Sequence, residues 1–287
     1  RTVINGALTM QQNVEQLLQR ILQQVSTEQL KLPSLPDIAL QVKACCDDDQ
    51  ADSASVAEVI SQDPAITARL MQLANSAFYQ TRQQVDSLST AITRLGLRMV
   101  RDLAVTLAMR QLYQAPNDIL QERLQELWLA GVKTAALART LSRPQGGLDA
   151  EQAMIAGLLH NIGALPVLLQ AAADEQIIED PALLAQVIHC CQGKVGAYMF
   201  RHWQFPEYMI DIALYCYDFE RRHPGSADYL DIVQAALVEG SIFTGLECPQ
   251  DWSSIPAFDK LHIDTDVHVL EIEDNRLMFE ETQSVLI

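Results

Sequence analysis

His160 and Asn161 form a polar pair at the end of an apolar run, Ala153 to Leu159, near the middle of the chain. The run has no strand-like alternation and follows Asp149, which is placed to cap a helix, so we expect a buried helix that ends at the pair. A histidine followed by a carboxylate in this position is a metal-binding pattern, because imidazole and carboxylate both bind divalent cations. The second residue here is an asparagine, and its neutral amide oxygen is the weaker ligand.

No histidine precedes His160 in the sequence, so no imidazole ligand can come from upstream in any register of the fold. A histidine held by a hydrogen bond at a helix end is the commoner case. We therefore assign no catalytic residue, no metal ligand and no cofactor. The enzyme alternative is that His160 joins carboxylates such as Asp211 or Asp218 around a hard metal.

Two further groups of side chains could bind ions. The soft ligands His189, Cys190, Cys191 and His202 could take zinc, although they lack ligand-type spacing. Arg94, Arg98 and Arg101 recur at helical spacing and could form an anion-binding stripe, although a solvated helix face is the commoner origin of such a pattern. The chain has six cysteines and no C-x-x-C motif, so we expect reduced thiols.

Asn75 and Ser76 stand where a predicted helix runs out before Phe78 and Tyr79. An asparagine at a helix end can satisfy terminal carbonyl groups, with the aromatic rings packed beneath it. We therefore expect a structural role and keep a binding role as the alternative. Glycine-rich phosphate loops, nucleophile elbows and paired-carboxylate spacing are absent from the sequence.

Charge and composition limit the partners of the chain. Its 287 residues include 37 acidic and 20 basic ones, for a formal net charge of −17, and 49% are hydrophobic. This charge repels a phosphate backbone, so nucleic acid is not an expected partner. We find no stretch of ~20 apolar residues for a membrane span and no signal-like N-terminus, so we expect a cytoplasmic protein without a membrane partner.

Apolar residues at helical spacing, with capping residues at the expected starts, predict an all-α protein. The expected helices cover 9–25, 36–46, 56–62, 64–74, 87–96, 97–113, 118–142, 153–159, 166–173, 180–191, 194–203 and 228–240, with a further one that begins at 205–206 and ends before the break at 223–225. Ser55 is expected to cap the third of these, and Gly193 to separate two others. Val267 to Ile272 could alternate as a strand. We divide the chain into an N-terminal amphipathic helix packed on the core (1–31), a helical domain (32–222) and a C-terminal helical extension (223–287).

The order of several short motifs resembles the HD-related output domain (HDOD) family, a bacterial signalling branch of the HD-type metal phosphohydrolase fold. The motifs are Leu32-Pro33-Ser34-Leu35-Pro36, Ile60 to Ile66, Leu73 to Ala77, Ala91 to Gly96, Leu127-Trp128, Ala156 to Gly163, Val195-Gly196-Ala197 and Trp203-Gln204-Phe205-Pro206. The resemblance covers about Leu32 to Phe219. It implies a multi-helix bundle of the HD-domain type.

The resemblance also implies where a metal site would lie. The parent enzymes bind metal through a histidine, a His-Asp pair and a later aspartate, a set that the output-domain branch commonly lacks. Ala130 stands here where the upstream ligand would fall, just after Trp128, and Asn161 replaces the paired aspartate. The matching motif residues are expected to be structural or partner-binding: Asp63, Pro64, Asn75, Ser76, Gly96, Gly157, Gly163, Trp203 and Pro206.

We therefore expect a non-catalytic signalling or regulatory module that presents a helical surface to a protein partner. Two alternatives stay open at this point. One is a metal-dependent phosphohydrolase with a rearranged site, and the other is a small-molecule sensor that uses the former active-site hollow as a pocket. The sequence does not indicate the oligomeric state.

Overall fold

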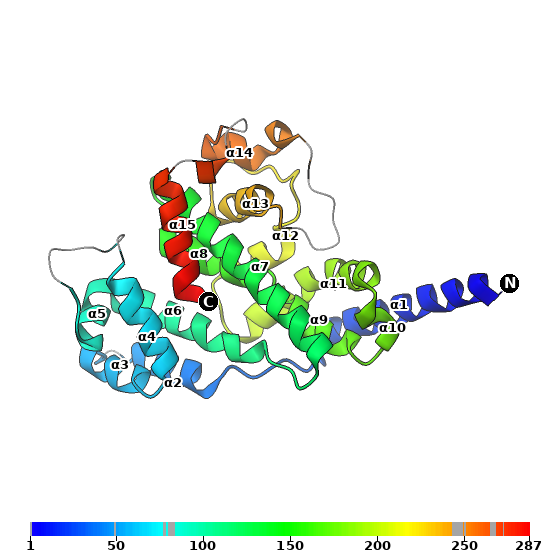
Figure 1. The fold of residues 1–287 in the computed structure, drawn as a ribbon, viewed down its shortest axis with the longest axis horizontal. Coiled ribbons are helices and arrows are strands. Elements are labelled where there is room, and N and C mark those ends of the chain that lie inside the picture. Colours follow the sequence, from blue (N-terminus) through cyan, green and yellow to red (C-terminus); the bar gives the residue numbers. More distant parts are fainter. Residues whose placement is uncertain are drawn as a thin grey trace.

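The fold was established from a computed structural model of the chain. It describes residues 2–48, 50–76, 79, 84–242, 249, 251–264, 268–271 and 273–287. Within these ranges the regular elements are α-helices and short 3-10 helices, without a strand, and Figure 1 shows them as one multi-helix arrangement. The predicted all-α class is therefore confirmed.

The elements follow one another along the chain as a series of helices joined by short connections. They are α1 (Thr2–Ser26), α2 (Asp37–Cys46), α3 (Ser53–Ile60), α4 (Pro64–Ala74), α5 (Leu88–Leu95), α6 (Leu97–Ala108), η2 (Met109–Leu112), α7 (Asp118–Ser142), α8 (Ala150–Leu159), α9 (Ala164–Ala171), α10 (Glu175–Glu179), α11 (Pro181–His202), α12 (Glu207–Tyr215), α13 (Tyr229–Glu239), η3 (Trp252–Ser254), α14 (Pro256–Leu261), η4 (Val269–Glu271) and α15 (Glu273–Leu286).

Local capping chemistry sets many of the helix starts. Asp63 accepts hydrogen bonds from the first turn of α4, with Pro64 at its first position, and Asp149 does the same for α8. Each of these side chains satisfies backbone N–H groups that have no partner inside the helix. The predicted starts at these two residues are therefore confirmed.

Three local predictions are wrong. Asp52, not Ser55, caps α3, and Ser55 instead closes the capping box as the third helical residue. Gly193 lies inside the continuous helix α11 and does not divide it. Its role is to let α11 and α12 approach closely, because a Cβ there would lie 3.0 Å from the Ala213 carbonyl oxygen. Val269–Glu271 forms a 3-10 helix instead of a strand, while Val267 and Ile272 lie outside the described residues.

Figure 1 shows α7 running through the middle of the molecule, with α2 to α6 on one side and α9 to α12 on the other. Helices α13 and α15 both pack on α7. Helix α1 packs on α11, and Val14, Leu17 and Ile21 are buried in the main core. These three residues attach the N-terminal helix to the core.

The stretch Ala150–Ala171 is long and apolar enough to cross a membrane, contrary to the expectation from the sequence. In the fold it is divided by a turn at residues 160–163 into α8 and α9, and nearly all of it is buried inside the protein. Its apolar character is therefore used for packing between α7 and α11.

Glycines allow the backbones to meet on both sides of this turn. A Cβ at Gly157 would lie 2.8 Å from the Thr134 carbonyl oxygen on α7, and a Cβ at Gly163 would lie 2.8 Å from the Gly196 Cα on α11. Such distances are too short for a carbon atom, so the two helices adjoining the turn are fixed by direct backbone contact.

We expect Gly163→Ala to destabilise the protein by ~1–3 kcal/mol or more, because the added Cβ would meet backbone atoms of Gln192 and Gly196, which cannot rotate away. The control is Gly146→Ala in an exposed turn, where a Cβ meets nothing within 4 Å and the change should stay within ~0.5 kcal/mol. Urea unfolding of the two variants measures the difference. Equal stabilities would show that α11 can move away from the turn.

Candidate functional site

His160 is almost fully buried at the C-terminal end of α8. Its Nδ1 lies 2.7 Å from the Gly157 carbonyl oxygen, which can only accept, so Nδ1 carries the proton and donates. The other ring nitrogen, Nε2, lies 3.5 Å from the Tyr217 hydroxyl. Burial lowers the pKa of His160 to about 4, more than the hydrogen bond to Gly157 raises it. The ring is therefore neutral at ordinary pH.

Asn161 is buried beside it and its amide ties the turn to α7. Its Nδ2 donates to the Leu127 carbonyl oxygen at 3.0 Å, and no described group donates to its buried Oδ1. Ala130, one turn further along α7, is partly buried and offers only a methyl group. Of the four ligands that the family resemblance implies, the three that can be matched to positions in this sequence thus provide one neutral imidazole, one amide and no third ligand atom.

These residues do not fit a divalent metal ion. Tight binding needs several converging donors, and a carboxylate normally supplies part of the charge. Asp211 and Asp218, the carboxylates of the rearranged-site alternative, are both exposed, whereas His160 is buried. Among the described residues, His160 belongs to no group of three His, Cys, Asp or Glu side chains whose ligand atoms lie within 4.8 Å of one another.

The predicted soft-ligand group is also not assembled. His189 and His202 lie 13 residues apart on the single helix α11, or roughly 20 Å along its axis at 1.5 Å per residue. Cys190 is exposed, whereas Cys191 is buried and its pKa is raised to about 11 by burial, which disfavours the thiolate that binds zinc. Cys45, Cys46 and Cys216 are also free thiols, and Cys248 lies outside the described residues.

The three arginines of the predicted stripe have different surroundings. The Nη1 of Arg94 donates to the Ala74 carbonyl oxygen at the end of α4. Arg101 pairs with Asp47 at 3.0 Å and with Asp102 at 2.9 Å. Arg98 is exposed and has no hydrogen bond or ion pair with any residue in the described part of the chain. A continuous stripe of three unpaired cations is therefore not present.

Asn75 acts as a strut in the structure. Its Nδ2 donates to the Met71 and Val85 carbonyl oxygens, and its Oδ1 accepts from the Val85 backbone N–H at 2.7 Å. Ser76 is buried beside it, and its hydroxyl has no described partner. The side chain thus joins the end of α4 to the segment before α5. Phe78 lies outside the described residues.

The other motif residues divide into packing positions and one exposed position. Gly157 and Gly163 permit the helix contacts described above, and Gly96 has a φ of +86° between α5 and α6, a conformation that favours glycine. Trp203 is buried at the end of α11, whereas Pro206 is exposed at the start of α12.

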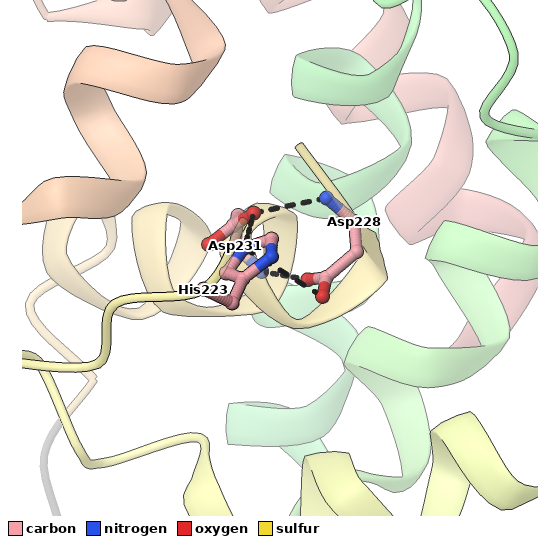
Figure 2. Close-up of side chains that lie close together, drawn as sticks. All are labelled: His223, Asp228 and Asp231. Atoms are coloured by element: carbon pink, nitrogen blue, oxygen red, sulfur yellow. Dashed lines mark hydrogen bonds and ion pairs between the residues drawn. The ribbon is translucent and has the colours of Figure 1, made fainter. Parts of the chain in front are cut away.

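Sequence reasoning missed a cluster that does bring metal-type ligands together. His223, Asp228 and Asp231 gather at the start of α13, as Figure 2 shows. The His223 Nε2 lies 2.8 Å from the Asp231 Oδ2, and the Arg221 guanidinium bonds both carboxylates. The Lys260 Nζ lies 3.2 Å from the His223 Nδ1.

Two cationic side chains, Arg221 and Lys260, thus already bond this cluster. Asp228 also caps α13 through the backbone N–H groups of Leu230 and Asp231. A cation would have to displace the guanidinium and the cap, so we interpret the cluster as an ion-pair network that joins α14 to the start of α13. The segment Arg221 to Asp231, with basic residues before a Pro-Gly turn and acidic residues after it, is the sequence signal that could have indicated it.

A second network was also missed, because its members are far apart in the sequence. Arg139 is fully buried on α7, and its Nε and Nη2 donate to the Glu151 Oε1 at 3.1 and 2.9 Å. Tyr79 donates to the same oxygen, and the Arg139 Nη1 donates to Thr282 on α15 at 2.9 Å. Because both charges are paired and buried, this network holds α7, α8 and α15 together.

Comparisons with known proteins place this geometry in context. Residues 32–219 match the family model of the HDOD domain. An "Uncharacterized protein" of Treponema pallidum (strain Nichols) is 28% identical over 196 residues, which are 63% of this chain and 36% of that protein. The chain therefore spans about a third of the length of this curated relative.

Two solved structures are similar to the whole chain. One, from Shewanella amazonensis SB2B, is described as a "Putative metal-dependent phosphohydrolase"; it is 27% identical with a TM-score of 0.84, covering 96% of this chain and 100% of that one. The other is a "Putative signal transduction protein" from Marinobacter aquaeolei VT8, 18% identical with a TM-score of 0.61, covering 95% and 65%. At this lower identity the likeness shows the fold alone.

The buried His160 should make the protein less stable in mild acid. Its pKa is about 4 in the folded state against 6.5 for the free group, so the unfolded chain binds more protons between these values. Stability should fall as the pH drops from 6.5 to about 4 and level off below that, with a loss of up to ~3 kcal/mol. Urea unfolding at several pH values measures it.

His160→Gln removes the titrating group and should flatten this part of the pH dependence, whereas His202→Gln, on the surface of α11, should leave it in place. An unchanged slope in His160→Gln would show that the imidazole is solvated in the folded protein.

Asn161→Asp should not create a high-affinity metal site, because Ala130 still offers no ligand and no described carboxylate converges on His160. The new carboxylate would face the Leu127 carbonyl oxygen without a proton to donate, so we expect a destabilisation of ~1–3 kcal/mol. Calorimetric titration with Mn²⁺ tests the first expectation and urea unfolding the second. Tight stoichiometric binding by this single variant would mean that other residues complete a site.

Proposed function

Because the chain belongs to the HDOD domain family, we propose that it is a non-catalytic regulatory module of a signalling pathway that acts through contacts with a protein partner. The observation that carries the proposal is the state of the His160–Asn161 pair. Both side chains are used to hold the fold, His160 through the Gly157 carbonyl and Asn161 through the Leu127 carbonyl. A site built this way has neither the charge nor the ligand number for metal-assisted hydrolysis.

The similar proteins support a role as part of a larger system. The curated relative is much longer than the matched region, which fits a module joined to other segments. The solved structure from Marinobacter aquaeolei VT8 is described as a signal transduction protein. A helical module without chemistry of its own can serve such a system by presenting a surface to a partner.

We also propose a cytoplasmic location, which the reduced state of the cysteine thiols supports. Five described cysteines are free and two of them, Cys191 and Cys216, are buried. Burial raises the pKa of these two thiols, which keeps them unreactive. Free thiols of this kind are typical of reducing compartments. The net charge of −17 disfavours nucleic acid as the partner.

The competing enzyme hypothesis has one observation in its favour. The Nδ1–H of His160 donates to a backbone carbonyl, which is the orientation in which metal-bound histidines present Nε2 to the ion. Tyr217 stands at that nitrogen, and the solved structure described as a phosphohydrolase is similar over nearly the whole chain. The hypothesis still lacks a carboxylate and a second imidazole.

The sensor hypothesis also has an observation in its favour. Around α8 and α11, buried polar atoms without described partners include Asn161 Oδ1, His189 Nδ1 and both amide atoms of Gln192. Buried groups of this kind are normally met by water or by a ligand. These unsatisfied groups favour the binding of a small polar ligand near the former active site.

Turnover and metal content distinguish the proposal from its enzyme rival. With added Mn²⁺ or Mg²⁺, hydrolysis of nucleotides, cyclic dinucleotides and generic phosphoesters should be indistinguishable between the protein and its His160→Ala variant. Elemental analysis of the purified protein should find no stoichiometric divalent ion. Metal-dependent turnover that disappears in His160→Ala would establish the enzyme and refute the proposal.

A further inference from the structure

A cleft of about 340 Å³ lies where four segments meet that are far apart in the sequence. They are Leu35 with the C-terminal end of α2, one face of α6, part of α8, and the connection from α11 to α12 with the first turn of α12. None of its lining residues belongs to the His160–Asn161 pair. The volume is at the lower end of the range found for small-molecule pockets, roughly 300–1,000 Å³.

One side of the cleft is aromatic and apolar. Trp203, Phe205 and Tyr208 line it from the α11–α12 connection, and the buried side chains of Val105 and Ile155 lie at its base. Flat rings and branched aliphatic groups of this kind favour a planar guest, because ring stacking and apolar burial act over the same area.

The backbone holds this aromatic side in a fixed position. Gln204 has a φ of +57°, the left-handed conformation that usually takes glycine after a helix end. The Phe205 N–H donates to the Phe200 carbonyl oxygen at 2.9 Å, and the Gln204 N–H donates to the Arg201 carbonyl oxygen at 3.1 Å. Because the left-handed conformation is unfavourable for a residue that is not glycine, the surrounding contacts must fix this turn.

The polar base of the cleft is also fixed in advance. Gln152, 6% exposed, accepts a hydrogen bond from the Tyr208 hydroxyl and donates through Nε2 to the Asp102 Oδ2 at 3.0 Å. Burial raises the pKa of Tyr208, so its hydroxyl stays protonated and donates. Asp102 in turn pairs with Arg101. A relay whose members are already bonded loses little freedom when a ligand binds.

Positive charge stands at the rim of the cleft in an otherwise acidic protein. Lys43 and Arg101 already have partners, since the Lys43 Nζ lies 3.4 Å from the Trp203 carbonyl oxygen and Arg101 bonds Asp47. Arg98 has no bonded partner among the described residues, and its charge acts on the Tyr208 hydroxyl. Arg98 also lines an adjoining hollow of about 320 Å³ together with Gln152. A guanidinium in this position can bind an anionic oxygen group.

We propose that this cleft binds a small planar organic anion, with its aromatic ring against Phe205 and Tyr208 and its acidic group at Arg98. The ligand class follows from the pairing of a fixed ring surface with one unpaired cation, and the site is separate from the former metal position. The inference does not rest on the regulatory role, because the cleft would bind such a ligand whether or not the protein has a partner.

Three probes separate the parts of this recognition. Anilinonaphthalene sulfonate carries both rings and an anion, phenylnaphthylamine has the same rings without the sulfonate, and methanesulfonate has the anion without rings. In low salt, fluorescence titration of the full chain should show saturable binding of the sulfonated dye at one site. The neutral dye should bind more weakly, and methanesulfonate at equal concentration should displace neither.

Two matched arginine variants locate the anion. Arg98→Gln should lower the affinity for the sulfonated dye about tenfold, the equivalent of ~1.4 kcal/mol, and should leave the affinity for the neutral dye unchanged. Arg222→Gln changes the net charge equally at an exposed position that lines neither hollow, and it should alter the affinity by about twofold or less. Equal losses in both variants would overturn the proposal, because the effect would then be one of net charge.

Phe205→Leu locates the rings, and thermal unfolding of this variant checks that the fold is retained. The substitution should lower the affinity for both dyes, since both place the same rings in the cleft. Unchanged binding of both dyes, or binding to many sites without saturation, would mean that the dyes lie on other apolar surface, and the proposal would fail.

Discussion

The backbone contact between the turn at residues 160–163 and the helices beside it constrains the rest of the structure. Gly157 brings α8 against the α7 backbone, and Gly163 brings the turn against α11. Three chain segments are thereby fixed with no side chain between them, so His160 and Asn161 cannot move toward distant ligands without separating these helices. The chemistry of the pair is limited to what already lies within reach, which is a carbonyl group on each side and one tyrosine hydroxyl.

In this position neutral polar side chains stabilise the fold better than charged ones. The Asn161 amide can donate to the Leu127 carbonyl, which an aspartate cannot do unless it is protonated. The imidazole of His160 likewise stays neutral because burial outweighs its hydrogen bond. The buried charges nearby, Arg139 and Glu151, are instead paired with each other and tie α15 to the centre of the fold. In this part of the fold the charged side chains therefore join helices, whereas the His160–Asn161 pair carries no charge.

Local signals explain which parts of the structure could be predicted from the sequence. Capping residues such as Asp63 and Asp149 act within one helical turn, so the helix starts and the place of the His160 pair could be predicted. Gly193 was misinterpreted because a helix contact with Ala213, distant in sequence, decides its role. The clusters around Arg139 and His223 and the cleft beside Trp203 join segments that no short-range pattern connects, and this is why they became apparent only in the folded chain.

The cleft and the His160–Asn161 pair share one rigid element. Gln152 and Ile155 line the cleft from α8, while His160 follows the last residue of this helix. This helix is buried from Glu151 to Leu159, and Glu151 is bonded to Arg139 on α7. Since α8 cannot shift without breaking that pair or the glycine contacts, a ligand in the cleft would act on the partly exposed groups at its rim. Those groups belong to α6 and to the α11–α12 connection, whose charged and aromatic side chains reach the protein surface.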